Sequence, residues 1–329
     1  MKIFISGATG FIGSHLVKLL LQQNHTLHLL VRTKKNENVL NHANVVYFLG
    51  DITDKNSLDA AIKDCDQAYH LAVYAEVWSK TPALYSQINV NGTLNVLNAA
   101  LENQVKKVVV VSSAAVYGPS VTSIITEDKV RETIFFNDYE VTKNAAEELI
   151  RSFVKRHSLP VVIATPTRVF GPLLQGKAQS INLMINQYIH HSWRVYPGSG
   201  KEIGNYVYVD DVVNGLVLVM QKGKSGQSYL LGGDNLTYIQ FYHKLSEATG
   251  IKRKMWRVPL LFQYAIAYYF LMKAKLFGFK PLITPKWISK GTYHWEVSSA
   301  KAEKELGYVR SNIDNSIHTT CQSFQLQQS

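Results

Sequence analysis

The first 31 residues alternate between short apolar runs and one segment with helical spacing. Residues 2–6 (KIFIS) and 26–31 (TLHLLV) are short and mostly apolar, as expected of buried strands. Residues 14–23 (SHLVKLLLQQ) repeat apolar positions every three or four residues, as expected of a helix that packs on a sheet. The pattern therefore predicts a strand, a turn over residues 7–13, a helix and a second strand, which together form a βαβ unit.

The same alternation continues through the first half of the chain. Further strands are predicted at residues 45–49, 68–73 and 107–112, and helices at residues 85–104 and 139–157. The run KVVVVS at residues 107–112 is the most β-branched stretch, which favours a strand covered on both faces. Strands that alternate with helices predict an α/β fold with a Rossmann-type, doubly wound parallel sheet.

Three glycines in the spacing GxxGxxG define the turn after the first strand. Gly7 permits a tight turn, Gly10 lets the backbone approach a pyrophosphate, and Gly13 lets the helix pack closely on the strand. The free N–H groups and the dipole at the start of the helix would hold the negative charge. The alternative is a glycine-rich turn without a ligand, but the position between a strand and a helix favours a dinucleotide site.

The second strand ends in basic residues at the place where a site for NAD has an acidic one. The sequence there is VRTKK (residues 31–35), so no carboxylate is available to bind the ribose 2′-hydroxyl. Arg32 and Lys35 can instead neutralise a 2′-phosphate. The pattern indicates NADP, with NAD or an exposed basic turn as the alternatives.

Small and polar residues follow the other predicted strands, at the edge where doubly wound sheets bind ligands. Asp51 follows the third strand and can bind the adenine amino group or cap the next helix. Ala72, in the fourth strand, is small enough to leave room beside a cofactor. Ser112 and Ser113 end the strand at residues 107–112, so their hydroxyls are expected to face the same crevice.

Tyr139 and Lys143 stand at the start of the helix predicted over residues 139–157. Because they are four residues apart, they share one helical face and lie one turn from each other. A phenol is a poor base at neutral pH, and a nearby ammonium stabilises its anion and lowers its pKa. The pair predicts a proton donor and acceptor, with an incidental tyrosine on a surface helix as the alternative.

These segments together resemble the extended short-chain dehydrogenase/reductase family. Within that family the chain is most similar to the dihydroflavonol-reductase and hydroxysteroid-dehydrogenase branch, to which a bacterial group of NAD-dependent epimerases and dehydratases is related. The resemblance covers nearly the whole chain and includes the glycine turn, Gly50-Asp51, Ser112-Ser113, Tyr139 and Lys143, and residues 166–172, 197–200 and 208–212. It implies that Tyr139 is the general acid/base, that Lys143 is its electrostatic partner and that Ser113 orients a carbonyl.

The resemblance also implies a set of cofactor contacts and no metal. The contacts are Gly7, Thr9, Gly10, Phe11, Ile12, Gly13, Arg32, Lys35, Asp51, Ile52, Leu71, Ala72, Val73, Ser112, Tyr139, Lys143, Pro166 and Val169. The implied reaction is reduction of a ketone, or oxidation of the alcohol, on a hydrophobic or polycyclic small molecule by hydride transfer. A nucleotide-sugar epimerase with tightly bound NAD is the alternative enzyme. An NADP-sensing regulator or a membrane-associated scaffold is the alternative without catalysis.

Two departures from the family narrow the reaction. Sugar-nucleotide dehydratases carry an Asp-Glu pair directly after the active hydroxyl, whereas this chain has Ala114 and Ala115, which argues against elimination. Epimerases commonly have a proline shortly before the tyrosine, whereas residues 134–138 are IFFND. Phe135 and Phe136 suit a hydrophobic ketone better than a sugar, or are packing residues.

Composition and charge limit the partners. The 329 residues have a formal charge of +11, which suits an acidic partner, but no helix-turn-helix or zinc finger supports binding to nucleic acid. Cys65 and Cys321 offer neither a disulfide framework nor metal spacing, which agrees with a reducing cytoplasm. Lys2 and the apolar residues after it imitate a secretion signal, but the glycines interrupt the run, so no export is expected.

The expected organisation is one interleaved unit. The nucleotide-binding core is predicted at residues 1–170, with residues 206–233 returning to it, and the substrate-binding region at residues 171–205 and 234–329. The chain is expected to return to the sheet around residues 207–219 and 228–231, and its Gln-rich end from residue 322 is expected to fray.

Residues 258–278 (VPLLFQYAIAYYFLMKAKLFG) are the most unusual segment. Residues 260–272 are apolar except for Gln263, and the run is too short to span a bilayer comfortably. A lid over an apolar substrate, a helix on a membrane surface, and a buried core helix or dimer contact all remain open. Basic residues that could assist at a membrane are Lys252, Arg253, Lys254, Arg257, Lys280 and Lys286.

Overall fold

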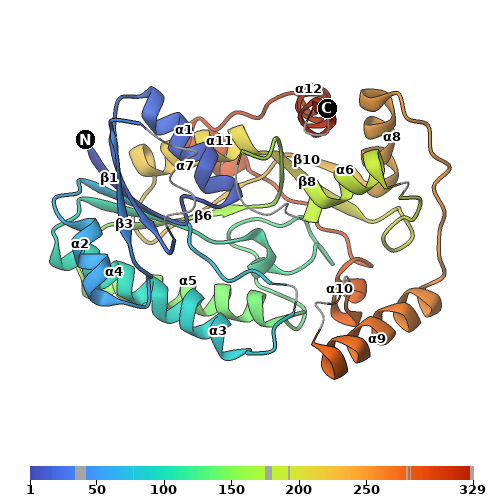
Figure 1. The fold of residues 1–329 in the computed structure, drawn as a ribbon, viewed down its shortest axis with the longest axis horizontal. Coiled ribbons are helices and arrows are strands. Elements are labelled where there is room, and N and C mark those ends of the chain that lie inside the picture. Colours follow the sequence, from blue (N-terminus) through green and yellow to red (C-terminus); the bar gives the residue numbers. More distant parts are fainter. Residues whose placement is uncertain are drawn as a thin grey trace.

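The computed structural model contains two sheets, and helices cover both faces of the larger one (Figure 1). It describes residues 1–33, 42–76, 78–174, 180–191, 193–278, 281 and 283–326. Among these residues, no helix combines the length and the hydropathy that crossing a bilayer requires.

The larger sheet has seven parallel strands in the order β3-β2-β1-β4-β5-β6-β9. The strands are β1 (Lys2–Ser6), β2 (Thr26–Val31), β3 (Val45–Leu49), β4 (Gln67–His70), β5 (Lys107–Val111), β6 (Val161–Pro166) and β9 (Ser228–Leu231). This confirms the predicted Rossmann-type fold. The strand order reverses between β1 and β4, so the carboxyl ends of these strands form the switch point at which such sheets bind ligands.

The fourth strand is shorter than the predicted span of residues 68–73. In the β1–β4 register the last pair is Ser6 with His70, because β1 ends where Gly7 turns the chain with a φ of 76°. Beyond His70 the strand loses its partner, although the N–H of Leu71 still donates to the Ser6 carbonyl at 3.0 Å. Residues 71–73 therefore belong to the edge where ligands bind rather than to the strand.

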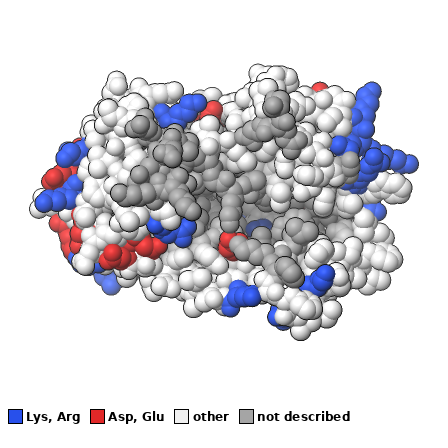
Figure 2. Space-filling view, viewed as in Figure 1, with Lys and Arg blue, Asp and Glu red and all other residues white. Residues whose placement is uncertain are grey.

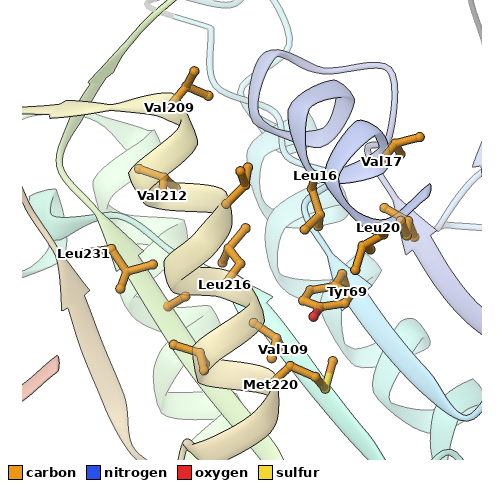
Figure 3. Close-up of a cluster of buried hydrophobic side chains, with 14 of the residues drawn as sticks. Leu16, Val17, Leu20, Tyr69, Val109, Val209, Val212, Leu216, Met220 and Leu231 are labelled. Carbon is orange, nitrogen blue, oxygen red and sulfur yellow. The ribbon is translucent and has the colours of Figure 1, made fainter. Parts of the chain in front are cut away.

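Two hydrophobic layers sandwich the larger sheet. One face is covered by α1 (Phe11–Gln22), α7 (Val209–Lys222) and α11 (Ala300–Leu306), and the other by α2 (Lys55–Ile62), α4 (Gly92–Glu102) and α5 (Asp138–Arg156). On the first face, Leu16 and Leu20 of α1 and Val212, Leu216 and Met220 of α7 gather over the strands (Figure 3). These residues recur every three or four positions, so one apolar stripe of each helix is buried.

The second sheet is small and mixed, and it makes up the core of the carboxyl half. Its strands, in the order β10-β8-β7, are β10 (Asp234–Thr237), β8 (Ile203–Tyr208) and β7 (Arg168–Phe170), and its helices are α6 (Ser180–His190), α8 (Tyr238–Thr249) and α12 (Ile313–Leu326). Both predicted boundaries, at residues 170 and 206, fall inside or beside strands of this sheet. Of the two predicted returns to the larger sheet, residues 228–231 form β9, whereas residues 209–222 cover the sheet as helix α7.

The end of the chain is more regular than predicted. Helix α12 continues through Leu326, so residues 322–326 are helical, and Phe324 is buried against the second sheet. The Gln-rich segment therefore contributes a packing face up to that point.

Helix α9 (Leu260–Phe277) lies on the outside of the molecule and contacts α10 (Pro285–Lys290) (Figure 1). Its covered side consists of Gln263, Ala267 and Ala274, while most of its large apolar residues are exposed. The interpretation of this segment as a buried core helix is therefore wrong. Its composition suggested a core position, but few other elements pack on it.

Candidate active site

The glycine turn after β1 brings the backbone of three segments close together. Gly7 has a φ of 76°, and a Cβ there would lie 2.6 Å from the N atom of Ala72. A Cβ on Gly13 would lie 2.1 Å from the Gly7 carbonyl oxygen. Gly10, in contrast, has a φ of −79° and is less crowded, since a Cβ there would meet only that same oxygen, in a tight contact of 3.2 Å. Backbone overlap thus requires glycine at positions 7 and 13, whereas Gly10 is the least crowded of the three.

The start of α1 suits a phosphate group. Gly10 is the N-cap and supplies no side-chain hydrogen bond, and the first turn contains no acidic residue. The N–H groups of Phe11, Ile12 and Gly13 therefore face the turn together with the positive end of the helix dipole. Thr9 lies beside them in the turn, and the Phe11 ring is buried against His15. These features fit a dinucleotide whose pyrophosphate rests on the turn.

The ends of β2 and β3 carry the residues predicted to contact the adenosine part. Arg32 directly follows β2 and is exposed, while Lys35 lies outside the described residues. Asp51 does not cap α2, because Asp54 does so by accepting from the N–H of Asn56. Instead, Asp51 Oδ1 accepts from the N–H and the hydroxyl of Thr53 at 2.9 and 2.8 Å. In the part of the chain that the structure describes, Oδ2 of Asp51 makes no hydrogen bond and is available to a ligand.

The residues after β4 lie directly against the glycine turn that follows β1. Leu71 and Ala72 are half-buried and Val73 is exposed, and Ala72 is the residue that Gly7 approaches. Beneath them, His70 Nδ1 shares a hydrogen bond of 2.7 Å with the Ser6 hydroxyl. Burial lowers the pKa of His70 to about 3, so its ring is a neutral structural group. Ile52 is buried on the same side of the sheet as α4.

The two serines after β5 have different surroundings. Ser113 is half-buried and N-caps the short helix η3 (Ala114–Tyr117), accepting from the N–H of Ala115 at 3.3 Å. Ser112 is 5% exposed, and its hydroxyl oxygen is buried without a hydrogen-bond partner among the described residues. Burial raises the pKa of the neighbouring Glu147 carboxyl of α5, and the Ser112 hydroxyl partly offsets this. The geometry thus distinguishes a serine that faces the site, Ser113, from one that packs against α5.

Tyr139 lies in the first turn of α5, which Asn137 begins by accepting from the N–H of Glu140 at 2.9 Å. Burial raises the pKa of the Tyr139 phenol, the nearby Ser113 hydroxyl partly offsets this, and the charge of Glu140 adds to it. The structure therefore brings Ser113 and Tyr139 together. It differs from the sequence-based expectation that the pKa of the phenol is lowered.

Lys143 is buried one turn further along α5. Its Nζ donates to the Val111 carbonyl oxygen at the end of β5, at 2.7 Å. Burial lowers the pKa of this ammonium to about 8, and the charge of Glu147 opposes the shift. Lys143 thus stands at the carboxyl end of the central strand, where a bound nicotinamide ribose would lie in a Rossmann sheet.

Sequence reasoning missed a buried charge cluster next to the tyrosine. Glu140 is fully buried, and its oxygens accept from Arg131 at 2.7 Å and from Lys290 of α10 at 2.8 Å. The same carboxylate accepts from the N–H of Phe136 at 3.1 Å. The cluster fixes the segment before Tyr139 and joins it to the carboxyl half of the chain.

Asn89 is a second positioning residue that was not among the predicted site residues. It lies in the π-helical turn η2 (Gln87–Asn91), which follows α3 (Ala83–Ser86), and it is 1% exposed. Its side chain bonds both the N–H and the carbonyl of Tyr74, at 2.8 and 3.1 Å, and donates to the Thr142 hydroxyl at 3.0 Å. This asparagine ties the segment after β4 to the helix that carries Tyr139. Nothing in the sequence distinguished it, because Gln87 and Asn91 on either side are also polar.

The last predicted contacts lie at the junction of the two sheets. Pro166 ends β6 in the larger sheet, and Val169 is in β7 of the smaller one, where it is buried. Phe136 is also buried, against Tyr293 and Trp295, and Phe135 lies under the Arg131 guanidinium at 4.2 Å. Both phenylalanines are engaged in packing, so they are no evidence for the substrate.

The structure combines a Rossmann-type sheet with a glycine turn at its switch point, and it brings Ser113, which follows β5, close to Tyr139 of α5, one turn before Lys143. Residues 3–232 match the NAD dependent epimerase/dehydratase family, so the chain belongs to this family of extended short-chain dehydrogenases/reductases. It is an NAD(P)-dependent enzyme.

Individual relatives carry out differently named reactions. The chain is 30% identical over 254 residues to dTDP-D-glucose 4,6-dehydratase of Dictyostelium discoideum, covering 71% of this chain but only 58% of that protein's length. It is 28% identical over 321 residues to sterol demethylase protein B of Methylococcus capsulatus, covering 94% of both chains. The solved structure of UDP-glucose 4-epimerase from Thermotoga maritima has a TM-score of 0.83 at 23% identity and covers 100% of each chain, which shows the shared fold.

Proposed function

We propose that this protein is an NADP(H)-dependent reductase of ketones on hydrophobic or polycyclic small molecules. The observation that carries the proposal is the grouping of Ser113, Tyr139 and Lys143 beside the glycine turn, with alanines and no carboxylate directly after Ser113. A dehydratase would need an acid and a base next to the reacting carbons to remove water. The nearby Glu140 cannot serve, because Arg131 and Lys290 hold its carboxylate.

Each of the three residues has a distinct task in this reaction. A phenol is protonated at neutral pH, and burial raises the pKa of Tyr139 further, so it can donate a proton to the carbonyl oxygen of a substrate. The Ser113 hydroxyl donates a hydrogen bond to the same oxygen, and the Lys143 ammonium favours the phenolate that remains. The nicotinamide cofactor supplies the hydride when bound.

The hydrophobic substrate class has support from one relative. Sterol demethylase protein B, which by its name acts on a sterol, matches 94% of this chain and 94% of its own length. The two buried and unpaired cysteines, Cys65 and Cys321, agree with a cytoplasmic enzyme.

A cofactor-consumption screen tests the function. Purified protein would be mixed with NADPH or NADH and with steroid, flavonoid and simple aryl ketones, and the absorbance of the reduced nicotinamide would be followed. We expect consumption with at least one polycyclic ketone. If no ketone is reduced with either cofactor, and the purified protein instead retains a nucleotide and interconverts sugar nucleotides, the reductase proposal is wrong.

Replacing Arg32 tests the choice of NADP. Arg32→Asp places a carboxylate beside the ribose, which repels a 2′-phosphate and can accept from a 2′-hydroxyl. Since a charge-assisted hydrogen bond contributes about 1.5–3 kcal/mol, we expect the Kd of NADPH to rise at least about tenfold while that of NADH rises little or falls. Arg156→Asp is the matched control, because Arg156 lies in the last turn of α5, at the end of that helix away from Tyr139. Equal losses for both cofactors would mean that Arg32 does not read the 2′-phosphate.

A further inference from the structure

Helix α9 presents a wide apolar face that no described part of the chain covers. Six large side chains on it are more than half exposed: Leu261 at 78%, Phe262 at 60%, Tyr268 at 60%, Met272 at 54%, Leu276 at 69% and Phe277 at 67%. No residue of α9 belongs to any hydrophobic cluster found among the described residues. A helix that is apolar all round is normally buried on every side, so this face indicates a missing partner.

The side of α9 that the protein does cover consists of two small residues and one polar residue. Ala267 and Ala274 are fully buried, and the Gln263 amide donates to the carbonyl oxygens of Gly198 and Val258 at 3.2 and 2.7 Å. These three residues are spaced four and seven apart, so they share one face of the helix. The helix is therefore held by its small face, and the large side chains are turned outward.

The charge around the helix identifies the partner. Between residues 248 and 295 the sequence has nine Lys and Arg residues and no Asp or Glu, which accounts for most of the net charge of +11. Blue side chains gather at the right-hand edge of the view, over the segment that joins α8 to α9, and no red ones lie among them (Figure 2). The exposed cations are Lys252, Lys254, Arg257, Lys273, Lys275 and Lys286. Of the two other basic residues proposed from sequence, Arg253 is engaged with Tyr188 and Lys280 lies outside the described residues.

Aromatic residues stand beside these cations. Trp256 is 57% exposed with Lys254 Nζ 5.5 Å from its ring, and Lys273 Nζ lies 5.4 Å from the ring of Tyr269. Exposed Trp and Tyr next to lysine is the composition found where a protein meets the boundary between lipid headgroups and acyl chains.

We propose that α9 docks on the surface of an anionic phospholipid bilayer, with its apolar side chains among the acyl chains and the surrounding cations on the headgroups. A second copy of this chain fits less well, because pairing two α9 faces would bring two strongly positive segments together. The proposal does not depend on which substrate the enzyme reduces.

Vesicle sedimentation with the full-length protein tests the proposal. The probes are vesicles of phosphatidylcholine alone and of phosphatidylcholine mixed with phosphatidylserine. We expect binding at low salt to the mixed vesicles, little binding to the neutral ones, and weaker binding as salt rises. Replacing Lys252, Lys254 and Arg257 with glutamine should weaken binding roughly fivefold per charge removed.

A charged double variant and a matched control separate lipid binding from general effects. Leu261→Glu with Phe262→Glu should lower vesicle affinity at least about tenfold, since carboxylates would have to enter the headgroup region. Val309→Glu, at a residue that is equally exposed (77%) but away from α9, should leave it unchanged. Both variants should keep the wild-type circular dichroism and nucleotide affinity, because the substituted side chains point outward.

Two results would overturn the proposal. One is the absence of sedimentation with the mixed vesicles at low salt, and the other is unchanged binding of the Leu261→Glu, Phe262→Glu variant. If the wild type does not bind vesicles but forms a dimer that this variant dissociates, a second copy covers α9 and the lipid assignment is wrong.

Discussion

Replacing Tyr139 with phenylalanine should remove nearly all turnover while leaving the fold and nucleotide binding intact. The substitution deletes only the phenol oxygen, which is the proton donor proposed for the reduction. General acid–base catalysis contributes about 10²–10⁴-fold, so kcat should fall by that factor. The ring would remain in the first turn of α5, and Ser113 would keep its bond to the N–H of Ala115. The measurement is steady-state reduction of the best ketone from the screen, together with nucleotide titration.

Tyr117→Phe is the matched control for this experiment. Tyr117 is also a buried tyrosine, in the short helix η3 that Ser113 begins, but the reaction assigns no task to its hydroxyl. Turnover close to the wild-type value is expected for this variant. If Tyr139→Phe also retains near-wild-type turnover, Tyr139 is not the proton donor and the reductase mechanism fails.

The parts of the fold and site that the sequence predicted are those set by local patterns. Short apolar runs and apolar positions at helical spacing lie within a single element, so β1, β2 and β5 were predicted nearly at their observed bounds. Helix α1 was predicted at residues 14–23 and begins earlier, at Phe11, because the last part of the glycine turn is already helical. The placement of Tyr139 and Lys143 on one face of α5 also follows from their spacing alone.

The charge cluster at Glu140 could not be predicted, because one of its partners is remote in sequence and the others are joined to it by an irregular segment. Lys290 is 150 residues away, and no spacing rule connects a lysine in α10 with a glutamate in α5. Whether such residues meet depends on how the carboxyl half packs against the nucleotide-binding half. The same reason explains Asn89, whose partners Tyr74 and Thr142 lie on two other segments.

The exposure of α9 was unpredictable for a related reason. Composition measures how much a helix would gain from burial, but burial itself depends on which elements are free to cover it. Here the second core is completed by α6, α8 and α12, so α9 remains on the outside. The buried core that its sequence suggested would therefore have to be supplied by something other than this chain.

Alanine at Gly13 and alanine at Gly10 should have different consequences, although the two glycines belong to one turn. A Cβ at position 13 would lie 2.1 Å from the Gly7 carbonyl oxygen and 2.9 Å from the Ala8 Cα, both in the backbone. Such an overlap forces α1 away from β1, and overpacking of this kind costs about 1–3 kcal/mol or more. Gly13→Ala should therefore lower both stability in urea and nucleotide affinity.

Gly10→Ala serves as the comparison because its steric conflict in the folded chain is much smaller. Its Cβ would meet only the Gly7 oxygen, at 3.2 Å, which a shift of a few tenths of an ångström relieves, and its φ of −79° suits any residue, so stability should fall much less than in Gly13→Ala. The new methyl group would, however, occupy the open side of the turn, where a pyrophosphate must approach the backbone. We expect at least about a tenfold loss of nucleotide affinity by calorimetric titration. If Gly10→Ala binds the nucleotide as tightly as the wild type, the phosphates do not rest on this turn and the cofactor site lies elsewhere.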